Sequence, residues 1–315
     1  MDRGKYATLL DEDLWAYIDR VDSWYPPGIA AAPIERQREV YDAMARAFRQ
    51  GRPEGVEVDD DTLPADDRSI PIRRYRMKGG KPQAAVVYYH GGGFILGGLE
   101  SHDDICAELC AGTGFEVVSV DYRLAPEHRH PAAFEDAMAA FAHVATATGL
   151  PLVLCGDSAG GNLAAVVAHA NRGGARTAVG QVLIYPALGG EPTGCSYVRH
   201  ADAPLLSVKD MEFYHAARTG GENVAEDPTL EPLADTDFSS LPATIVVTAE
   251  CDPLSSDGDA YCRRILEAGG KAFWREEPRL VHSFLRARRT VSRAQAAFEG
   301  IIAAVAALGR NEWPY

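Results

Sequence analysis

The sequence predicts an α/β fold in which a mostly parallel central sheet is flanked by helices. After residue 84, short apolar runs of the length of buried strands alternate with longer stretches of helical periodicity. This rhythm is typical of βαβ units, and therefore of a parallel sheet covered on both faces. A third observation is a serine framed by glycines at residues 156–160, between one apolar run and the helical segment that follows.

Residues 152–163, LVLCGDSAGGNL, contain that serine. Residues 156–160 fit the G-x-S-x-G nucleophile elbow, in which small neighbours allow a strained strand-to-helix turn that exposes the hydroxyl of Ser158. A helix that begins here directs free N–H groups and its positive dipole end toward an anion formed beside the serine. A glycine-rich turn with an incidental serine is the structural alternative.

The first fifty residues predict helices that precede the first strand. Apolar residues recur at helical spacing over 10–21 and 34–48, with a PPG break between them, so we expect a cover over the core. Residues 56–58 and 70–75 are strand-like and are separated by an acidic turn. The later predicted elements are strands at 84–89, 116–120, 152–155, 182–186, 243–249 and 271–276, and helices at 101–113, 131–148, 258–268 and 292–308.

Residues 187–242 lose this alternation and are rich in proline, glycine and acidic residues. A helical pattern at 207–218 lies within them, which predicts an insertion over the sheet.

Composition limits the classes of function. Hydrophobic residues make up 46% and charged residues 24% of the 315, as in a globular enzyme. The net charge of −14, from 31 basic and 45 acidic residues, opposes binding to nucleic acid or to an anionic membrane. The basic runs at 73–76 and 286–289 predict solvated faces.

Neither a signal-peptide core nor an apolar span of membrane length occurs in the sequence, so we expect a cytoplasmic protein. Cys106 and Cys110 stand four apart on a predicted helix but have no partnering pair at ligand spacing, which favours buried thiols over a metal site. The sequence HGGG at 90–93 lacks the spacing of a nucleotide-binding loop. We therefore expect neither metal nor cofactor.

Three polar residues follow strands of the predicted sheet. Ser158 follows the run at 152–155, Asp252 follows 243–249, and His282 follows the last predicted strand. Loops at the carboxyl ends of parallel strands gather at one edge, and the order Ser, Asp, His is that of an α/β-hydrolase triad.

Four stretches in one order resemble the hormone-sensitive lipase-like branch of the α/β-hydrolase family, a group of bacterial carboxylesterases. They are HGGGF at 90–94, DYRLAPEH at 121–128, GDSAGGNL at 156–163, and DPL at 252–254 with the later His282. The resemblance implies a helical cap segment at 1–50, a hydrolase core at 51–186 and 231–315, and a cap insertion at 187–230.

The chemistry assigns a role to each residue type. A serine hydroxyl needs a base within hydrogen-bond reach, here His282, and Asp252 would orient the imidazole and stabilise its charged form. Glu250, Asp257 and Asp259 compete for the acidic role, but the last two lie toward a helix N-terminus, where acids serve the dipole. The amides of Gly92, Gly93 and Ala159 are candidates for the oxyanion hole.

Other residues receive supporting assignments. The resemblance gives His90 a loop-bracing role, and Asp157 and Glu127 are expected to be hydrogen-bonding braces. Two departures from the family pattern are Ser283, where glycine is common, and Glu231, where serine is common. Six residues are candidates for the substrate pocket, with core or cap packing as the alternative for each: Phe94, Leu206, Phe213, Tyr214, Leu254 and Val281.

The sequence therefore predicts a serine carboxylesterase for short- to medium-chain acyl esters, acting through an acyl-enzyme intermediate. Hydrolysis of an amide, a carbamate or an acetylated small molecule is an alternative within the same chemistry. A catalytically silent small-molecule receptor is the alternative from another class, and the joint presence of serine, aspartate and histidine argues against it. Family analogy suggests a homodimer.

Overall fold

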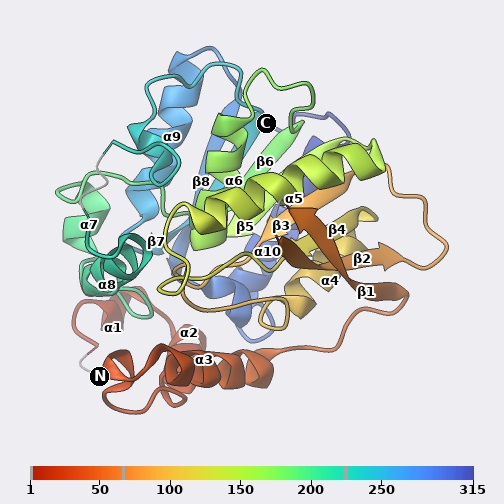
Figure 1. The fold of residues 1–315 in the computed structure, drawn as a ribbon. Coiled ribbons are helices and arrows are strands. Elements are labelled where there is room, and N and C mark those ends of the chain that lie inside the picture. The colour runs from red at the N-terminus through yellow and green to blue at the C-terminus, as the bar shows by residue number, and fades with distance from the viewer. Residues whose placement is uncertain (1–2, 66–67, 223–225) are drawn as a thin grey trace.

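The computed structural model describes residues 3–65, 68–222 and 226–315, and it confirms the predicted fold class. The described strands form one sheet in the order β1-β2-β4-β3-β5-β6-β7-β8 (Figure 1). Strands β3 to β8 are mutually parallel, whereas β1 and β2 pair antiparallel at one edge. The strands are β1 Val56–Ala65, β2 Arg68–Met77, β3 Ala85–Tyr89, β4 Glu116–Val120, β5 Leu152–Asp157, β6 Gly180–Ile184, β7 Ala243–Cys251 and β8 Ala272–Val281.

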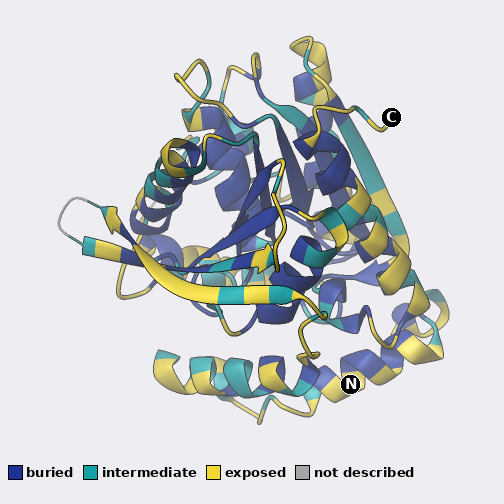
Figure 2. Ribbon diagram, turned by 90° about the vertical axis from the view of Figure 1, so that its right-hand side faces the viewer, coloured by how far each residue is buried: buried dark blue, intermediate teal, exposed yellow. Residues whose placement is uncertain are grey.

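Helices cover both faces of the sheet, as the alternation predicts. Helices α5, α6 and α9 pack on one face, and α4 and α10 pack on the other. Each face of the sheet therefore has its own apolar core, and the central strands are buried (Figure 2). The helices are α1 Tyr6–Leu9, α2 Glu12–Asp22, α3 Ile34–Phe48, α4 Asp103–Thr113, α5 Ala132–Thr148, α6 Ala159–Ala170, α7 Cys195–Arg199, α8 Val208–Thr219, α9 Ser255–Glu267 and α10 Ser292–Gly309.

Three elements differ from the prediction. The acidic segment after residue 58 continues strand β1 to Ala65, because its carboxylates face solvent and pair with arginines on β2. Strand β1 is the exposed edge strand of the sheet in Figure 2. Strand β8 continues to Val281 instead of ending at residue 276, since it pairs with the long strand β7. The five-residue helix α7 has too few turns to leave a periodic signal in the sequence.

The N-terminal helices lie across the carboxyl ends of the parallel strands, beside α7 and α8 (Figure 1). Arg38 of α3 ties them to the core, because it forms two 2.8 Å bonds with Glu127 and donates to the carbonyl of Ile95 at 2.9 Å. Glu127 thus acts as the expected brace. The division into cap and core at residues 50, 186 and 230 stays a prediction.

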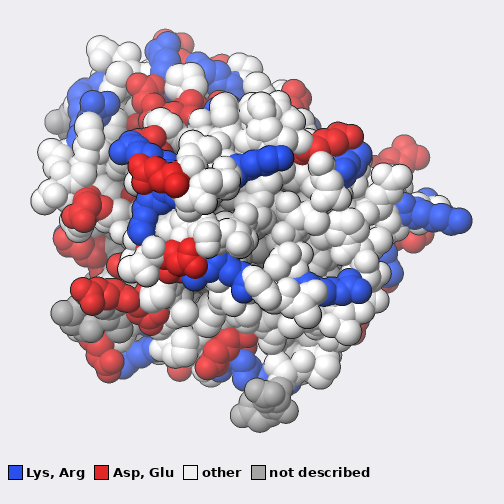
Figure 3. Space-filling model, turned by 90° about the horizontal axis from the view of Figure 1, so that it is seen from above, with Lys and Arg blue, Asp and Glu red and all other residues white. Residues whose placement is uncertain are grey.

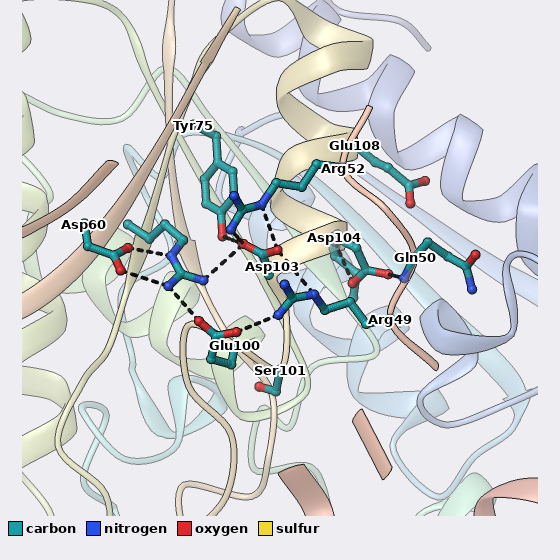
Figure 4. Close-up of polar contacts among 12 residues, drawn as sticks. Arg49, Gln50, Arg52, Asp60, Tyr75, Glu100, Ser101, Asp103, Asp104 and Glu108 are labelled. Carbon is teal, nitrogen blue, oxygen red and sulfur yellow. Dashed lines mark hydrogen bonds and ion pairs between the residues drawn. The ribbon is translucent and has the colours of Figure 1, made fainter. Parts of the chain in front are cut away.

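Arginines, aspartates and glutamates form an ion-pair cluster where the chain passes from α3 to the sheet (Figure 4). Asp103, at the start of α4, is fully buried and accepts from Arg52 at 2.9 Å and from Arg73 at 3.1 Å. Arg73 also bonds Asp60 and Glu100. We call this set, together with Arg49, Asp104, Glu108 and Arg288, the ion-pair cluster.

The cluster corrects the prediction made for the two basic runs. Arg76 and Arg289 are exposed, as expected of solvated faces. Arg73 and Arg288 are instead buried, because carboxylates of α4 and the loop before it compensate their charges. The sequence spacing of a basic run does not reveal such partners, since they lie about 30 to 180 residues away.

Acidic and basic side chains are interspersed on the face seen in Figure 3. Within the described residues, no helix combines the length and hydropathy required to cross a membrane.

Candidate active site

Ser158 lies in the sharp turn between β5 and α6. Its backbone has φ 55° and ψ −116°, a strained conformation for a residue with a side chain. The turn is possible because a Cβ atom at Gly160 would lie 1.9 Å from the carbonyl oxygen of Tyr89, so only glycine fits there. The amide of Ser158 donates to Ile184 at 2.8 Å, which fixes the turn against β6.

Strand register brings the other two residues together. An irregularity in the pairing of β7 with β8 sets Cys251 opposite Val281, so Asp252 and His282 both follow the last pair of the ladder. Such bulges commonly redirect side chains beside active sites. The result is that Asp252 and His282, 30 residues apart in sequence, leave the sheet side by side.

The three side chains form a continuous hydrogen-bonded chain. His282 Nδ1 lies 2.7 Å from Asp252 Oδ2, and His282 Nε2 lies 2.9 Å from Ser158 Oγ. Asp252 is fully buried and its other oxygen accepts from the amide of Leu254 at 2.9 Å. With Nδ1 donating to the carboxylate, Nε2 presents a lone pair to the serine hydroxyl.

The competing acids have other partners. Glu250 accepts from the amide of Arg279, and Asp259 pairs with Arg263 on the surface of α9. Asp257 accepts from the amides of Leu188 and Gly190 and from the hydroxyl of Tyr197, and so holds the loop after β6. None of the three forms a hydrogen bond or an ion pair with His282 among the interactions of the described residues.

Three amides near Ser158 are free to receive a substrate oxygen. Gly92 and Gly93 follow β3, the strand beside β5, and Ala159 is the first residue of α6. All three line one cavity with Ser158, and none of their N–H groups donates to another described group of the protein. Gly93 has φ 60°, and a Cβ atom there would lie 2.5 Å from the ring of Tyr214.

Buried polar groups hold this glycine loop. Asp157 accepts from the amide of Gly91 at 3.0 Å and from the hydroxyl of Tyr88 at 2.7 Å. Burial raises the pKa of Asp157, but His102 and the Tyr88 hydroxyl outweigh it, so the pKa lies below its ordinary value. His90 stacks on Tyr122, and burial lowers its pKa to about 3, so its ring is neutral at pH 7 and acts as a brace.

Ser158 and His282 lie in the wall of a cavity of about 970 Å³. Five of the six candidate pocket residues line it, namely Phe94, Leu206, Phe213, Tyr214 and Leu254. Val281 does not line this cavity. As the last residue of β8 it points into the core, where it is fully buried.

Several lining residues had no local signal in the sequence. Tyr25 follows α2, Tyr41 and Met44 lie on α3, and Arg218 and Arg286 come from the second half of the chain. Helical periodicity identifies the inward face of α3 but cannot say what that face covers. Among the described residues, no group of three or more side chains is arranged to hold a metal ion.

The two departures from the family pattern lie at the site. Ser283 has φ 62°, a left-handed conformation in which glycine is least strained, and Tyr17 donates to its carbonyl at 3.0 Å. Glu231 lines the cavity opposite Gly189, where a Cβ atom would lie 2.5 Å from the Glu231 side chain.

The geometry has counterparts in known proteins. A family model described as the alpha/beta hydrolase fold matches residues 86–286. The carboxylic ester hydrolase LipN of Mycobacterium tuberculosis is 38% identical over 73% of this chain and 65% of its own, so the match spans slightly less than two thirds of LipN. The ethyl acetate hydrolase of Pseudomonas putida is 32% identical over 96% of this chain and 99% of its own.

Solved structures agree with these sequence matches. An ester hydrolase, EH1AB1, from the metagenome of Lake Arreo has a TM-score of 0.88 at 35% identity and covers 95% of this chain and 99% of its own. An esterase of Pyrobaculum calidifontis has a TM-score of 0.86 at 35% identity, with coverage of 94% and 98%.

Proposed function

Because this chain belongs to the α/β-hydrolase family, in its hormone-sensitive lipase-like branch, we propose that it is a serine carboxylesterase for short- to medium-chain acyl esters. The observation that carries the proposal is the hydrogen-bonded chain from Asp252 through His282 to Ser158. Its resemblance to proteins named as ester hydrolases supports the substrate class.

The first step acylates the enzyme. Ser158 Oγ attacks the ester carbonyl carbon while its proton passes to His282 Nε2, and Asp252 stabilises the imidazolium that forms. The carbonyl oxygen becomes an oxyanion, which the amides of Gly93 and Ala159 receive together with that of Gly92. Each such donor lowers the barrier by about 3 kcal/mol.

Acylation ends when His282 gives its proton to the departing alkoxide, which leaves as the alcohol. The second step releases the acid. A water molecule then attacks the acyl carbon on Ser158 while His282 takes one of its protons. The bond from the acyl carbon to Ser158 Oγ breaks, His282 returns the proton to Ser158 Oγ, and the carboxylic acid leaves. The net reaction is ester plus water to acid plus alcohol.

Activity and labelling test this assignment. We expect the purified protein to hydrolyse p-nitrophenyl acetate and butyrate, and Ser158→Ala to lower kcat by about 10⁴-fold or more. A fluorophosphonate probe should label the wild type and not the variant. Undiminished turnover by a folded Ser158→Ala protein, or no labelling of the wild type, would contradict the mechanism.

The cellular location and the oligomeric state of the protein stay predictions. The free cysteines, of which Cys106, Cys110, Cys155, Cys251 and Cys262 are buried, are compatible with the reducing cytoplasm that we propose. A homodimer is proposed only by analogy with the family.

A further inference from the structure

Arg218 lies near the end of α8, in the wall of the cavity that contains Ser158. Its side chain is buried, with the residue only 6% exposed. The guanidinium carbon lies 3.5 Å from the centre of the Phe94 ring. Nη1 donates to the carbonyl of Leu230 at 3.2 Å and Nη2 to the side-chain oxygen of Asn162 at 3.3 Å.

This charge has no counterion within the described residues. No carboxylate oxygen of the described residues lies within 4.0 Å of an Arg218 nitrogen. The Nε of Arg218 is buried and has no hydrogen-bond partner. Burial lowers the pKa of Arg218 to about 9, while Glu231 and Asp227 act only from a distance, so the group is cationic at pH 7. A buried cation with two long hydrogen bonds and an idle donor destabilises the folded state unless an anion joins it.

Asn162 places the guanidinium relative to the nucleophile. The amide of Asn162 donates to the carbonyl of Ser158 at 3.1 Å, so the two residues are one turn of α6 apart. One turn rises about 5.4 Å. A substrate that places an anion at Arg218 and its ester carbonyl at Ser158 therefore needs only a short chain of atoms between the two groups.

The other charged groups of the cavity do not take this role. Glu231 lies 3.8 Å from His215 Nδ1, and the acids Asp22, Asp202, Asp210 and Glu212 also line the cavity and repel anions. Arg286 lines it too, but it is only partly buried and its donors reach the carbonyl of Ser101 and the hydroxyl of Tyr41 at 3.0 and 2.9 Å. Of the arginines described in the cavity wall, Arg218 is the one whose Nε is buried without a hydrogen-bond partner.

We infer that Arg218 binds a carboxylate carried by the substrate, so that the preferred esters are half-esters of short dicarboxylic acids or acyl esters of short hydroxy acids. This inference rests on the proposed function, since it names the substrate class of the same site. A buried guanidinium gains more from a carboxylate than an exposed one does, because solvent screens the pair less. The two substrate types share one chemistry and differ in which half of the ester carries the anion.

Two matched substrate pairs test the inference by titration of the released acid. Monomethyl glutarate against methyl pentanoate places the carboxylate on the acyl half, and O-acetylglycolate against ethyl acetate places it on the alcohol half. For each pair we measure the ratio of kcat/KM, anionic over neutral. Arg218→Gln is expected to lower at least one ratio by about 10- to 100-fold, as for the loss of a hydrogen bond to a charged group.

Two further variants make the result specific. Arg218→Lys keeps the charge and is expected to retain more of the ratio than Arg218→Gln. Arg263→Gln makes the same substitution on the exposed surface of α9, outside the cavity, and is expected to change neither ratio. Ratios unchanged in both pairs for a folded Arg218→Gln protein would overturn the inference.

A binding measurement separates this inference from the proposed function. Calorimetric titration of Ser158→Ala with monomethyl glutarate should give binding that is lost in the double variant with Arg218→Gln. Hydrolysis of methyl pentanoate by the wild type tests the esterase proposal on its own. An active esterase without Arg218-dependent binding or preference would contradict the inference but not the proposed function. Arg218-dependent binding without any hydrolysis would contradict the proposed function but not the binding of a carboxylate.

Discussion

Arg73 and Arg218 are buried to nearly the same degree, at 7% and 6% exposed, in very different surroundings. Arg73, in the ion-pair cluster, contacts Asp60 at 2.6 Å, Glu100 at 2.7 Å and Asp103 at 3.1 Å. Arg218, in the cavity wall, has no carboxylate within 4.0 Å among the described residues.

Two buried carboxylates, Asp103 and Asp252, differ in the same way in how far their charges are compensated. Asp103 accepts from two arginines and from Tyr75, and although burial raises its pKa, the Arg52 bond and charge outweigh it, so the pKa lies below its ordinary value. Asp252 is equally buried, but among the described residues it accepts only from His282 and from the backbone amide of Leu254. In the proposed mechanism, its counterion is the imidazolium that forms during the reaction.

The difference separates stability from function. In the ion-pair cluster the charges are compensated in the resting protein, so the cluster fixes the N-terminal helices to α4. Around the cavity, under the two proposals above, the compensating charge comes from the substrate or from the reaction. Substitutions in the cluster should therefore change stability with little effect on turnover, and those at the cavity should do the reverse.

The largest expected effect is that of Asp252→Asn on catalysis. Without the carboxylate, the imidazole loses both its orientation and the stabilisation of its charged form, so we expect kcat to fall by about 10⁴-fold. The midpoint of urea unfolding should change little. A folded Asp252→Asn protein with wild-type kcat would contradict the proposed catalytic role of Asp252.

Asp103→Asn should have the opposite effect. Removal of one partner from a buried ion pair leaves Arg52 and Arg73 less compensated, and we expect a loss of about 3 kcal/mol in the free energy of unfolding. Urea unfolding at pH 7 measures the loss, and kcat of the folded variant on p-nitrophenyl butyrate should stay within about twofold. A large fall in kcat without a loss of stability would show that the cluster also serves the active site.

A smaller effect, dependent on pH, is expected at Asp257, which is 1% exposed and has no cationic partner in the described part of the chain. Burial raises its pKa to about 7, from 3.8, despite its hydrogen bonds. The folded protein thus holds this proton more tightly, so the stabilisation is present below pH 3.8 and is lost as the pH rises through about 7.

Relative to wild type, Asp257→Asn should therefore gain free energy of unfolding progressively between about pH 4 and pH 8, by a few kcal/mol at most. Urea unfolding of both proteins across this range measures the difference. Asp103 gives the matched contrast, because its lowered pKa predicts that its contribution is lost on acidification instead. A pH-independent difference for Asp257→Asn would mean that Asp257 is ionised throughout.

Much of the fold and part of the site follow from local sequence. The apolar run, the glycines and the Ala-rich segment around Ser158 determine a strand, a tight turn and a helix within twenty residues. The alternation of strands and helices predicts the parallel sheet, and the carboxyl-end rule predicts that the loops bearing Asp252 and His282 meet at one edge. These inferences need only neighbouring residues or a general rule of chain topology.

Other features depend on contacts between segments far apart in the chain. The register irregularity beside Cys251 and Val281 decides how Asp252 meets His282, and the packing of α8 decides that Arg218 rather than solvent-exposed arginines faces the cavity. Burial of Arg73 and Arg288 depends on carboxylates of α4 and the preceding loop, so the basic runs alone gave the wrong prediction.

The sequence by itself determined the alternation of elements and the residue types available for catalysis, because backbone preference and hydrophobic periodicity act over a few residues. Only the tertiary structure decided which charges are compensated and which remain open to a substrate. The physical reason is that electrostatic energy depends on distances in space and on exclusion of water, neither of which the order of residues specifies.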